Sequence, residues 1–138
     1  ESLLEVEITE TTLLRSTSRA HFVLGELRRR GVRVALDDFG TGHSSLANLA
    51  SFEVDALKID RSFVLADDRR SQAIVASIID LAHRLGIEVV AEGVETQAQH
   101  DALIAAGCDL LQGYLLGRPS APDARSLSDS LSLPPPEA

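Results

Sequence analysis

The same order of features recurs three times in this chain: a helical segment, a glycine, a short apolar strand and then a polar or acidic residue. The three copies, from glycine to polar residue, run over Gly31–Asp37, Gly86–Glu92 and Gly107–Gln112. Glycine readily adopts the left-handed conformation that ends a helix, and strands that alternate with helices pair in parallel. The repeat therefore predicts an α/β fold made of parallel βαβ units.

Hydrophobic periodicity places the other elements around this repeat. Strands are expected over residues 3–8, 32–36, 55–59, 87–91 and 108–111, and helices over 18–30, 44–50, 74–85 and 96–106. After Pro119 the composition shifts to Ser, Pro and Asp. This shift predicts a frayed tail over 120–138, with at most one short helix at 124–131.

The composition limits what such a chain can do. Its 138 residues, 44% of them hydrophobic, suffice for one core. The net charge of −8 would repel the phosphates of DNA or RNA, which argues against a duplex-binding surface. Cys108 is the only cysteine, and no apolar run reaches the ~20 residues that cross a bilayer. We therefore expect a soluble, cytoplasmic chain. Because residue 1 lies at the edge of a strand-like run, we also expect a longer parent protein, whose other segments could attach it to a membrane.

Ionisable and amide side chains gather where the predicted strands end. They are Glu7, Glu10, Asp37, Asp38, Lys58, Asp60, Glu92, Glu95 and Gln112. In a parallel α/β barrel these strand ends meet at one face, where the active sites of such barrels lie. Clustered carboxylates are stabilised by cations, and oxygen ligands suit Mg²⁺, Mn²⁺ or Ca²⁺. The pattern predicts a dinuclear metal site.

Each of these groups also has an ordinary structural interpretation. Asp37 and Asp38 precede a glycine-rich turn, so they could cap a helix and shape that turn. Lys58 could be a surface lysine, but its apolar neighbours favour a position inside the barrel, paired with an acid. Glu92 and Glu95 could lie in a solvated loop, with Glu95 at the start of a helix.

The other reactive side chains are expected to be structural. His21, His83 and His100 lie on helical segments without metal-ligand spacing. Cys108 has no assignable base to activate its thiolate, so we expect it to be a small core residue.

Five motifs together resemble the EAL family of bacterial cyclic-di-GMP phosphodiesterases. They are Glu5-Val6-Glu7-Ile8-Thr9-Glu10, Asp37-Asp38-Phe39-Gly40-Thr41-Gly42, Lys58-Ile59-Asp60-Arg61-Ser62-Phe63-Val64, Ala91-Glu92-Gly93-Val94-Glu95-Thr96 and Gln112-Gly113-Tyr114 through Pro119. The resemblance implies that residues 1–119 are the C-terminal part of a TIM-type (β/α) barrel, with about five parallel strands and alternating helices. It also implies hydrolysis of cyclic-di-GMP to linear pGpG in second-messenger signalling. Two Mg²⁺ or Mn²⁺ ions would serve this reaction, and Ca²⁺ is a candidate inhibitor.

The resemblance further implies roles for the strand-end residues. Glu7 would ligate the first metal, Asp37 would bridge both ions and Asp38 would serve the second. Lys58 would hold the attacking water or a phosphate oxygen, while Glu92 would ligate a metal or act as the base. Two cations about 3.5–4 Å apart can generate hydroxide and stabilise charge on the attacked phosphate, so the set suits an in-line displacement.

Three further residues and two departures complete the comparison with the family. Gln112 would complete the shell around the substrate or water, and Glu10 with Glu95 would brace the loop over 39–45. The family's Glu-Ala-Leu and a ligand asparagine, both from earlier strands, are absent, and His43 stands where the family usually has tyrosine. We therefore expect the isolated chain to be inactive. Its open barrel should form a homodimer or pair with the missing half, and regulatory domains are expected in the full-length protein.

Two other functions remain open. A degenerate EAL domain would bind cyclic-di-GMP or a protein partner without hydrolysis. A Schiff-base aldolase would use Lys58, and only the position of this lysine at a strand end favours it.

Overall fold

Five parallel strands form one sheet in the order in which they occur along the chain. The computed structural model describes residues 4–9, 11–12, 17–40, 53–66 and 68–119. The strands are β1 (Glu5–Thr9), β2 (Arg33–Phe39), β3 (Ala56–Ile59), β4 (Glu88–Glu92) and β5 (Leu110–Gln112), in sheet order β1-β2-β3-β4-β5. The described helices are α2 (Thr17–Arg29), α4 (Arg61–Leu65), α5 (Arg69–Arg84) and α6 (Gln97–Ala105). The predicted α/β fold with five parallel strands and alternating helices is confirmed.

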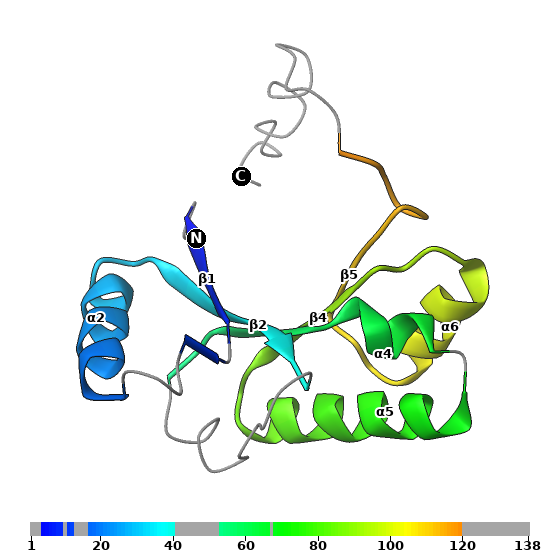
Figure 1. Cartoon of the computed structure of the whole chain (residues 1–138), viewed down its shortest axis with the longest axis horizontal. Coiled ribbons are helices and arrows are strands. Elements are labelled where there is room, and N and C mark those ends of the chain that lie inside the picture. Colours follow the sequence, from blue (N-terminus) through cyan, green and yellow to red (C-terminus); the bar gives the residue numbers. More distant parts are fainter. Residues whose placement is uncertain (1–3, 10, 13–16, 41–52, 67, 120–138) are drawn as a thin grey trace, which may run out of the picture.

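The helices cover one face of the sheet, and the hydrophobic core lies between the helices and the sheet. Figure 1 shows α2, α5 and α6 as an arc around the outside of the sheet, with β1 and β5 at its two ends. Leu24 of α2, Ile79 of α5 and Leu103 of α6 pack in one buried cluster with strand residues such as Leu57 and Val89. Among the described residues, no helix is both long and apolar enough to span a bilayer.

The glycines of the repeat end the helices as expected. Gly31, Gly86 and Gly107 have φ angles of 79°, 72° and 86°. Each follows a helix and precedes the strand to which the chain returns. The left-handed conformation turns the chain within two or three residues, so each strand starts beside the end of its helix.

Several predicted boundaries are wrong. The second strand extends through Asp37 and Asp38 to Phe39 instead of ending at residue 36. The helix predicted over 74–85 begins earlier, because the side chain of Asp68 accepts hydrogen bonds from the backbone at the first turn of α5. Its buried residues are Val75, Ile79 and Ala82, with Ile78 and Leu81 partly buried against the same core. The helices predicted over 44–50 and 124–131 lie outside the described residues.

Gly113 lies where β5 and the turn after β4 approach closely. A Cβ atom built on Gly113 would lie 2.2 Å from the carbonyl oxygen of Val94 and 2.3 Å from its nitrogen. The same backbone groups of Val94 bond to Gln112 and Leu115, at 3.1 and 3.0 Å. A side chain at position 113 would therefore separate the two segments.

We expect Gly113→Ala to lower the free energy of unfolding by about 2 kcal/mol or more, because the added methyl group has no room beside the backbone. Gly117→Ala is the matched control, since a Cβ there meets nothing within 4 Å. Denaturant unfolding of both variants measures the difference. Equal stabilities would contradict the close approach.

Candidate functional site

The strand register places the candidate residues on the face of the sheet opposite the helices. Glu7 pairs with Ala35, Ala35 with Ala56, Lys58 with Val90, and Glu92 with Gln112. Because side chains alternate between the two faces along each strand, five candidate residues share one face. They are Glu7, Asp37, Lys58, Glu92 and Gln112.

Lys58 is the centre of this group. It is the one charged residue found buried among the described residues, with 7% of its surface exposed. Its ammonium Nζ lies 2.5 Å from a carboxylate oxygen of Glu7 and 2.5 Å from one of Glu92. Lys58 thus joins β1 to β4 across the sheet, and the predicted pairing of this lysine with an acid is confirmed.

The charges around Lys58 keep its amine protonated. Burial alone would lower the pKa of Lys58, but hydrogen bonds to Glu7 and Glu92 and the charges of Glu92 and Asp37 outweigh it and raise the pKa above its ordinary value. A Schiff-base lysine needs a lowered pKa, so that the neutral amine can attack a carbonyl. This environment is therefore the opposite of what the aldolase hypothesis requires.

A β-bulge in β2 carries the two adjacent aspartates. Leu36 pairs with Leu57 and Phe39 with Ile59, so β2 has one residue more than β3 between these pairs. Asp38 takes up the extra residue with a φ of 56°, and its N–H donates to Oδ1 of Asp37 at 2.9 Å. Aspartate tolerates this left-handed conformation better than most residues, and bulges often direct side chains at active sites.

Desolvation and the crowding of carboxylates together raise the pKa of Asp38. Partial burial is the largest cause, followed by the negative charges of Asp37 and Asp60, and a smaller contribution comes from Glu7. The positive charge of Lys58 acts in the opposite direction. A second cation near Asp38 would relieve this crowding.

The side chains of the group are of the type that binds hard divalent cations, but among the described residues too few of them are gathered at one point to hold an ion. Carboxylate oxygens of Glu7, Asp37, Asp38 and Glu92 are the ligand type that Mg²⁺ and Mn²⁺ prefer. Within the described ranges, however, no three His, Cys, Asp or Glu side chains are arranged to hold one ion. A complete metal centre would need further ligands or a movement of these side chains.

The other predicted site residues lie in different settings. Gln112 is exposed at the end of β5, and its carbonyl accepts the N–H of Val94 at 3.1 Å. Glu95 lies directly before α6, where its N–H donates to the side chain of Gln99 at 2.9 Å and Thr96 caps the helix. The helix-start interpretation of Glu95 therefore describes its position. Glu10, His43 and most of the loop over 39–45 lie outside the described residues.

A second polar layer, which the sequence patterns did not reveal, lies on the same face at the opposite ends of the strands. Arg33 of β2 forms ion pairs with Glu5 of β1 and Glu88 of β4. These positions share the face of Lys58, but Glu5 lies two residues before Glu7, Arg33 four before Asp37 and Glu88 four before Glu92. One cation between two carboxylates thus occurs twice, separated by the small buried residues Ala35 and Ala56.

The histidines and the cysteine have structural surroundings. His83 pairs with Asp109 at 2.8 Å and His100 with Asp101 at 3.0 Å, while His21 is exposed on α2. Cys108 is buried in the core, and burial raises the pKa of its thiol. The expectation that Cys108 is a small core residue is confirmed.

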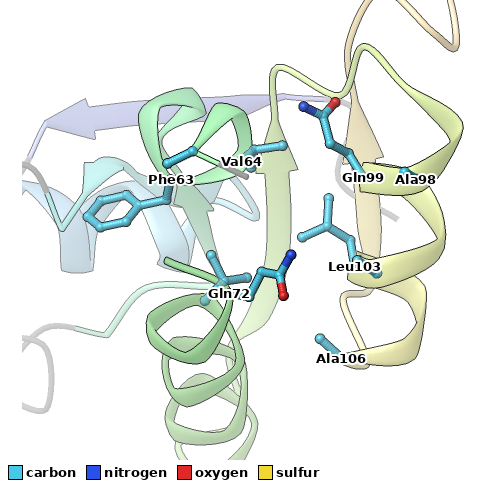
Figure 2. Close-up of a pocket in the computed structure, with 10 residues that line it drawn as sticks. Phe63, Val64, Gln72, Ala98, Gln99, Leu103 and Ala106 are labelled. Atoms are coloured by element: carbon cyan, nitrogen blue, oxygen red, sulfur yellow. The ribbon is translucent and has the colours of Figure 1, made fainter. Parts of the chain in front are cut away.

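An apolar groove of about 140 Å³ lies on the helical side of the sheet, between α4, α5 and α6. Figure 2 shows Val64, Gln72, Leu103 and Ala106 around it. None of the strand-end carboxylates lines this groove. This groove and the polar strand ends therefore lie on different sides of the sheet.

Comparison with known proteins gives consistent similarities. A family model described as "EAL domain" matches residues 1–119. The bifunctional diguanylate cyclase/cyclic di-GMP phosphodiesterase MucR of Pseudomonas aeruginosa is 47% identical over 120 residues, which are 86% of this chain and 18% of that protein. The cyclic di-GMP phosphodiesterase RocR of the same organism is 44% identical over 115 residues, 82% of this chain and 29% of RocR.

Solved structures of such proteins resemble this fold. The PaMucR phosphodiesterase in complex with c-di-GMP has a TM-score of 0.81 and 45% identity, covering 90% of this chain and 50% of that chain. A manganese/cy-diGMP complex of Klebsiella pneumoniae BlrP1 has a TM-score of 0.78 and 41% identity, covering 83% of this chain and 30% of that chain. The chain therefore spans half or less of each of these relatives.

Proposed function

This chain belongs to the EAL domain family, and on that premise we propose that it forms the C-terminal part of a domain that hydrolyses cyclic-di-GMP to linear pGpG. The structured part would be residues 1–119, with 120–138 as a tail. The proposal places the reaction in second-messenger signalling. It is supported by relatives named cyclic di-GMP phosphodiesterases and by a structural relative complexed with c-di-GMP.

One observation carries the proposal: the bulge of β2 presents Asp37 and Asp38 beside a buried lysine that is held by Glu7 and Glu92. Arg33 is also held by two carboxylates, but the group around Lys58 has in addition two adjacent aspartates, placed where the regular strand pairing is interrupted. Phosphodiester hydrolysis requires anionic metal ligands and a fixed positive charge near the phosphate. The group supplies both kinds of charge.

Each residue has a specific part in this proposal. Asp37 would bridge two divalent cations, Mg²⁺ or Mn²⁺, with Glu7 on the first ion and Asp38 on the second. When bound, the ions would lower the pKa of a water and stabilise charge on the phosphate. Lys58 would orient the attacking water or a phosphate oxygen through its N–H donors, and Glu92 would hold a metal or accept the proton of the water.

Three residues would support this arrangement from its edges. Gln112, on the same face as Glu92, would donate to the water or substrate. Glu10 and Glu95 would brace the loop over 39–45. Ca²⁺ would compete for the same oxygen ligands and inhibit, because it prefers longer bonds and more ligands than Mg²⁺.

The direct test compares this chain with a complete domain that also contains the earlier strands. With Mg²⁺ or Mn²⁺, the complete domain should release pGpG from cyclic-di-GMP, detected by chromatography, whereas the isolated chain should not. The difference is expected because the family's Glu-Ala-Leu and ligand asparagine are absent from this sequence. Release of a mononucleotide or no turnover by the complete domain would overturn the proposal.

A binding domain without catalysis is the second candidate. It is favoured by the absence of a ready three-ligand metal arrangement within the described residues. Such a domain would bind cyclic-di-GMP or a protein partner with an affinity that does not depend on Mg²⁺. Calorimetric titration of the complete domain with cyclic-di-GMP, with and without the metal, separates the two functions.

We expect the isolated chain to assemble, because among the described residues no further strand pairs with β1 or β5 and several large apolar side chains are exposed. Leu110, Tyr114 and Leu116 at β5 and just beyond it are each at least half exposed. A homodimer, or pairing with the missing half of the barrel, should bury more than ~1,000 Å². Light scattering at micromolar concentration should give at least twice the monomer mass of 14.8 kDa. A monodisperse monomer with cooperative thermal unfolding would contradict this expectation.

A further inference from the structure

The short helix α4 lies between the turns that follow β2 and β4. It begins at Arg61, two residues after the last residue of β3, and Asp60 caps it by accepting the N–H of Ser62 at 2.9 Å. Lys58 is therefore connected to α4 by only two residues. Any shift of α4 would be transmitted directly to the strand that carries the lysine.

One side of α4 supports the turn after the bulge of β2. A Cβ atom built on Gly40 would lie 2.8 Å from Cε2 and 3.0 Å from Cζ of Phe63. The ring edge of Phe63 thus touches the backbone two residues after Asp38. Figure 2 shows this ring directed away from Leu103 and Ala106, so it does not point toward α6.

The start of α4 supports the turn after β4. A Cβ atom built on Gly93 would lie 2.5 Å from Cβ of Arg61. Gly93 directly follows Glu92, and its φ is 77°, while that of Gly40 is 96°. Both turns therefore use a glycine where α4 packs against them, and in each case the backbone contacts a side chain of α4 directly.

We propose that Phe63 is a positioning residue, which fixes the Asp37–Asp38 bulge relative to Lys58 and Glu92. With Arg61 against Gly93 and Phe63 against Gly40, α4 acts as a spacer between the two carboxylate groups on either side of β3. Errors of about 1 Å in such spacings can reduce catalysis by about 10²-fold. The functional part of this inference rests on the proposed hydrolysis, whereas the positioning itself does not.

Val64 provides the matched control within the same helix. It is 7% exposed and belongs to the hydrophobic core, and it lines the apolar groove. The three atoms nearest to a Cβ at Gly40 all belong to Phe63. Val64→Ala should therefore remove core packing from α4 without removing the support of the bulge.

The test uses the complete domain with Phe63→Ala, Phe63→Leu and Val64→Ala. Hydrogen exchange at residues 37–40, compared with β4 as a reference, should become selectively faster in Phe63→Ala. The Mn²⁺ concentration that gives half-maximal hydrolysis should rise about tenfold in the same variant. Phe63→Leu keeps apolar volume but not the reach of the ring, so it should fold well and show the same effects more weakly. Val64→Ala should lower the melting temperature and change neither the exchange ratio nor the Mn²⁺ dependence.

The outcomes separate the two proposals. If residues 37–40 exchange in both Phe63 variants as in the unmodified domain, relative to β4, the positioning inference is overturned. If Val64→Ala gives the same selective exchange as Phe63→Ala, the effect is general destabilisation and the inference is also overturned. If the unmodified domain does not hydrolyse cyclic-di-GMP, the proposed function fails, while the exchange measurement still decides whether Phe63 holds the bulge.

Discussion

Asp37→Asn should reduce hydrolysis of cyclic-di-GMP by the complete domain by about 10³-fold or more, with little change in stability. The substitution removes the negative charge that would bridge the two cations, and electrostatic contacts of this kind have effects of about that size. It keeps the shape of the side chain, because the amide oxygen of asparagine can still accept the N–H of Asp38, as Oδ1 of Asp37 does at 2.9 Å. The bulge of β2 should therefore persist.

Chromatographic detection of pGpG at saturating Mg²⁺, together with thermal unfolding, measures both parts of this prediction. Asp80→Asn on α5 is the control, because Asp80 is an exposed carboxylate that pairs with Arg84 of the same helix. The control should retain full turnover. Undiminished turnover by Asp37→Asn would show that Asp37 does not bridge the metals.

Lys58→Met should also reduce hydrolysis of cyclic-di-GMP by the complete domain, by about 10²-fold or more. It should destabilise the domain as well. Methionine approximates the length of the lysine stem but leaves the carboxylates of Glu7 and Glu92 without the cation that holds both at 2.5 Å. Removing one partner of a buried ion pair costs about 3–5 kcal/mol. We expect about 2 kcal/mol here, because the side chain of Glu7 is half exposed.

Arg33→Met distinguishes the loss of a cation paired with two carboxylates from the loss of one that would act in catalysis. Arg33 also lies between two carboxylates on the same face, but at the opposite ends of the strands. Its side chain is more exposed, so its removal should cost about 1 kcal/mol or less, and kcat/KM should be unchanged. Equal losses of activity in the two variants, measured by initial rates at matched folded fractions, would rule out a direct role for Lys58.

The parallel fold could be predicted because its signals are local and repeated. Glycines such as Gly86 end helices through their own backbone preference, and strands such as β4 contain a short apolar run, here Val89–Ala91. The same alternation that predicts a strand also predicts which side chains share a face. The apolar neighbours of Lys58 in the sequence therefore predicted that this lysine pairs with an acid.

The bulge and α4 could not be predicted in this way. A bulge is defined by pairing with another strand, and nothing within Asp37-Asp38 states that two residues of β2 face one of β3. The five residues of α4 are too few to show helical periodicity. The ion pairs of Arg33 with Glu5 and Glu88 could not be predicted, because these residues start their strands and no sequence motif groups them.

The extra residue of β2 has a genetic consequence. Deleting Asp38 would leave Leu36 opposite Leu57, Asp37 opposite Lys58 and Phe39 opposite Ile59, which is a regular parallel ladder with unchanged side-chain alternation. Phe39 would remain in the hydrophobic core and the residue with positive φ would disappear. Loss of a single in-frame codon would thus remove one carboxylate of the group while preserving the architecture around it. Deletion of one codon could therefore remove a carboxylate of the proposed metal site and leave the fold intact.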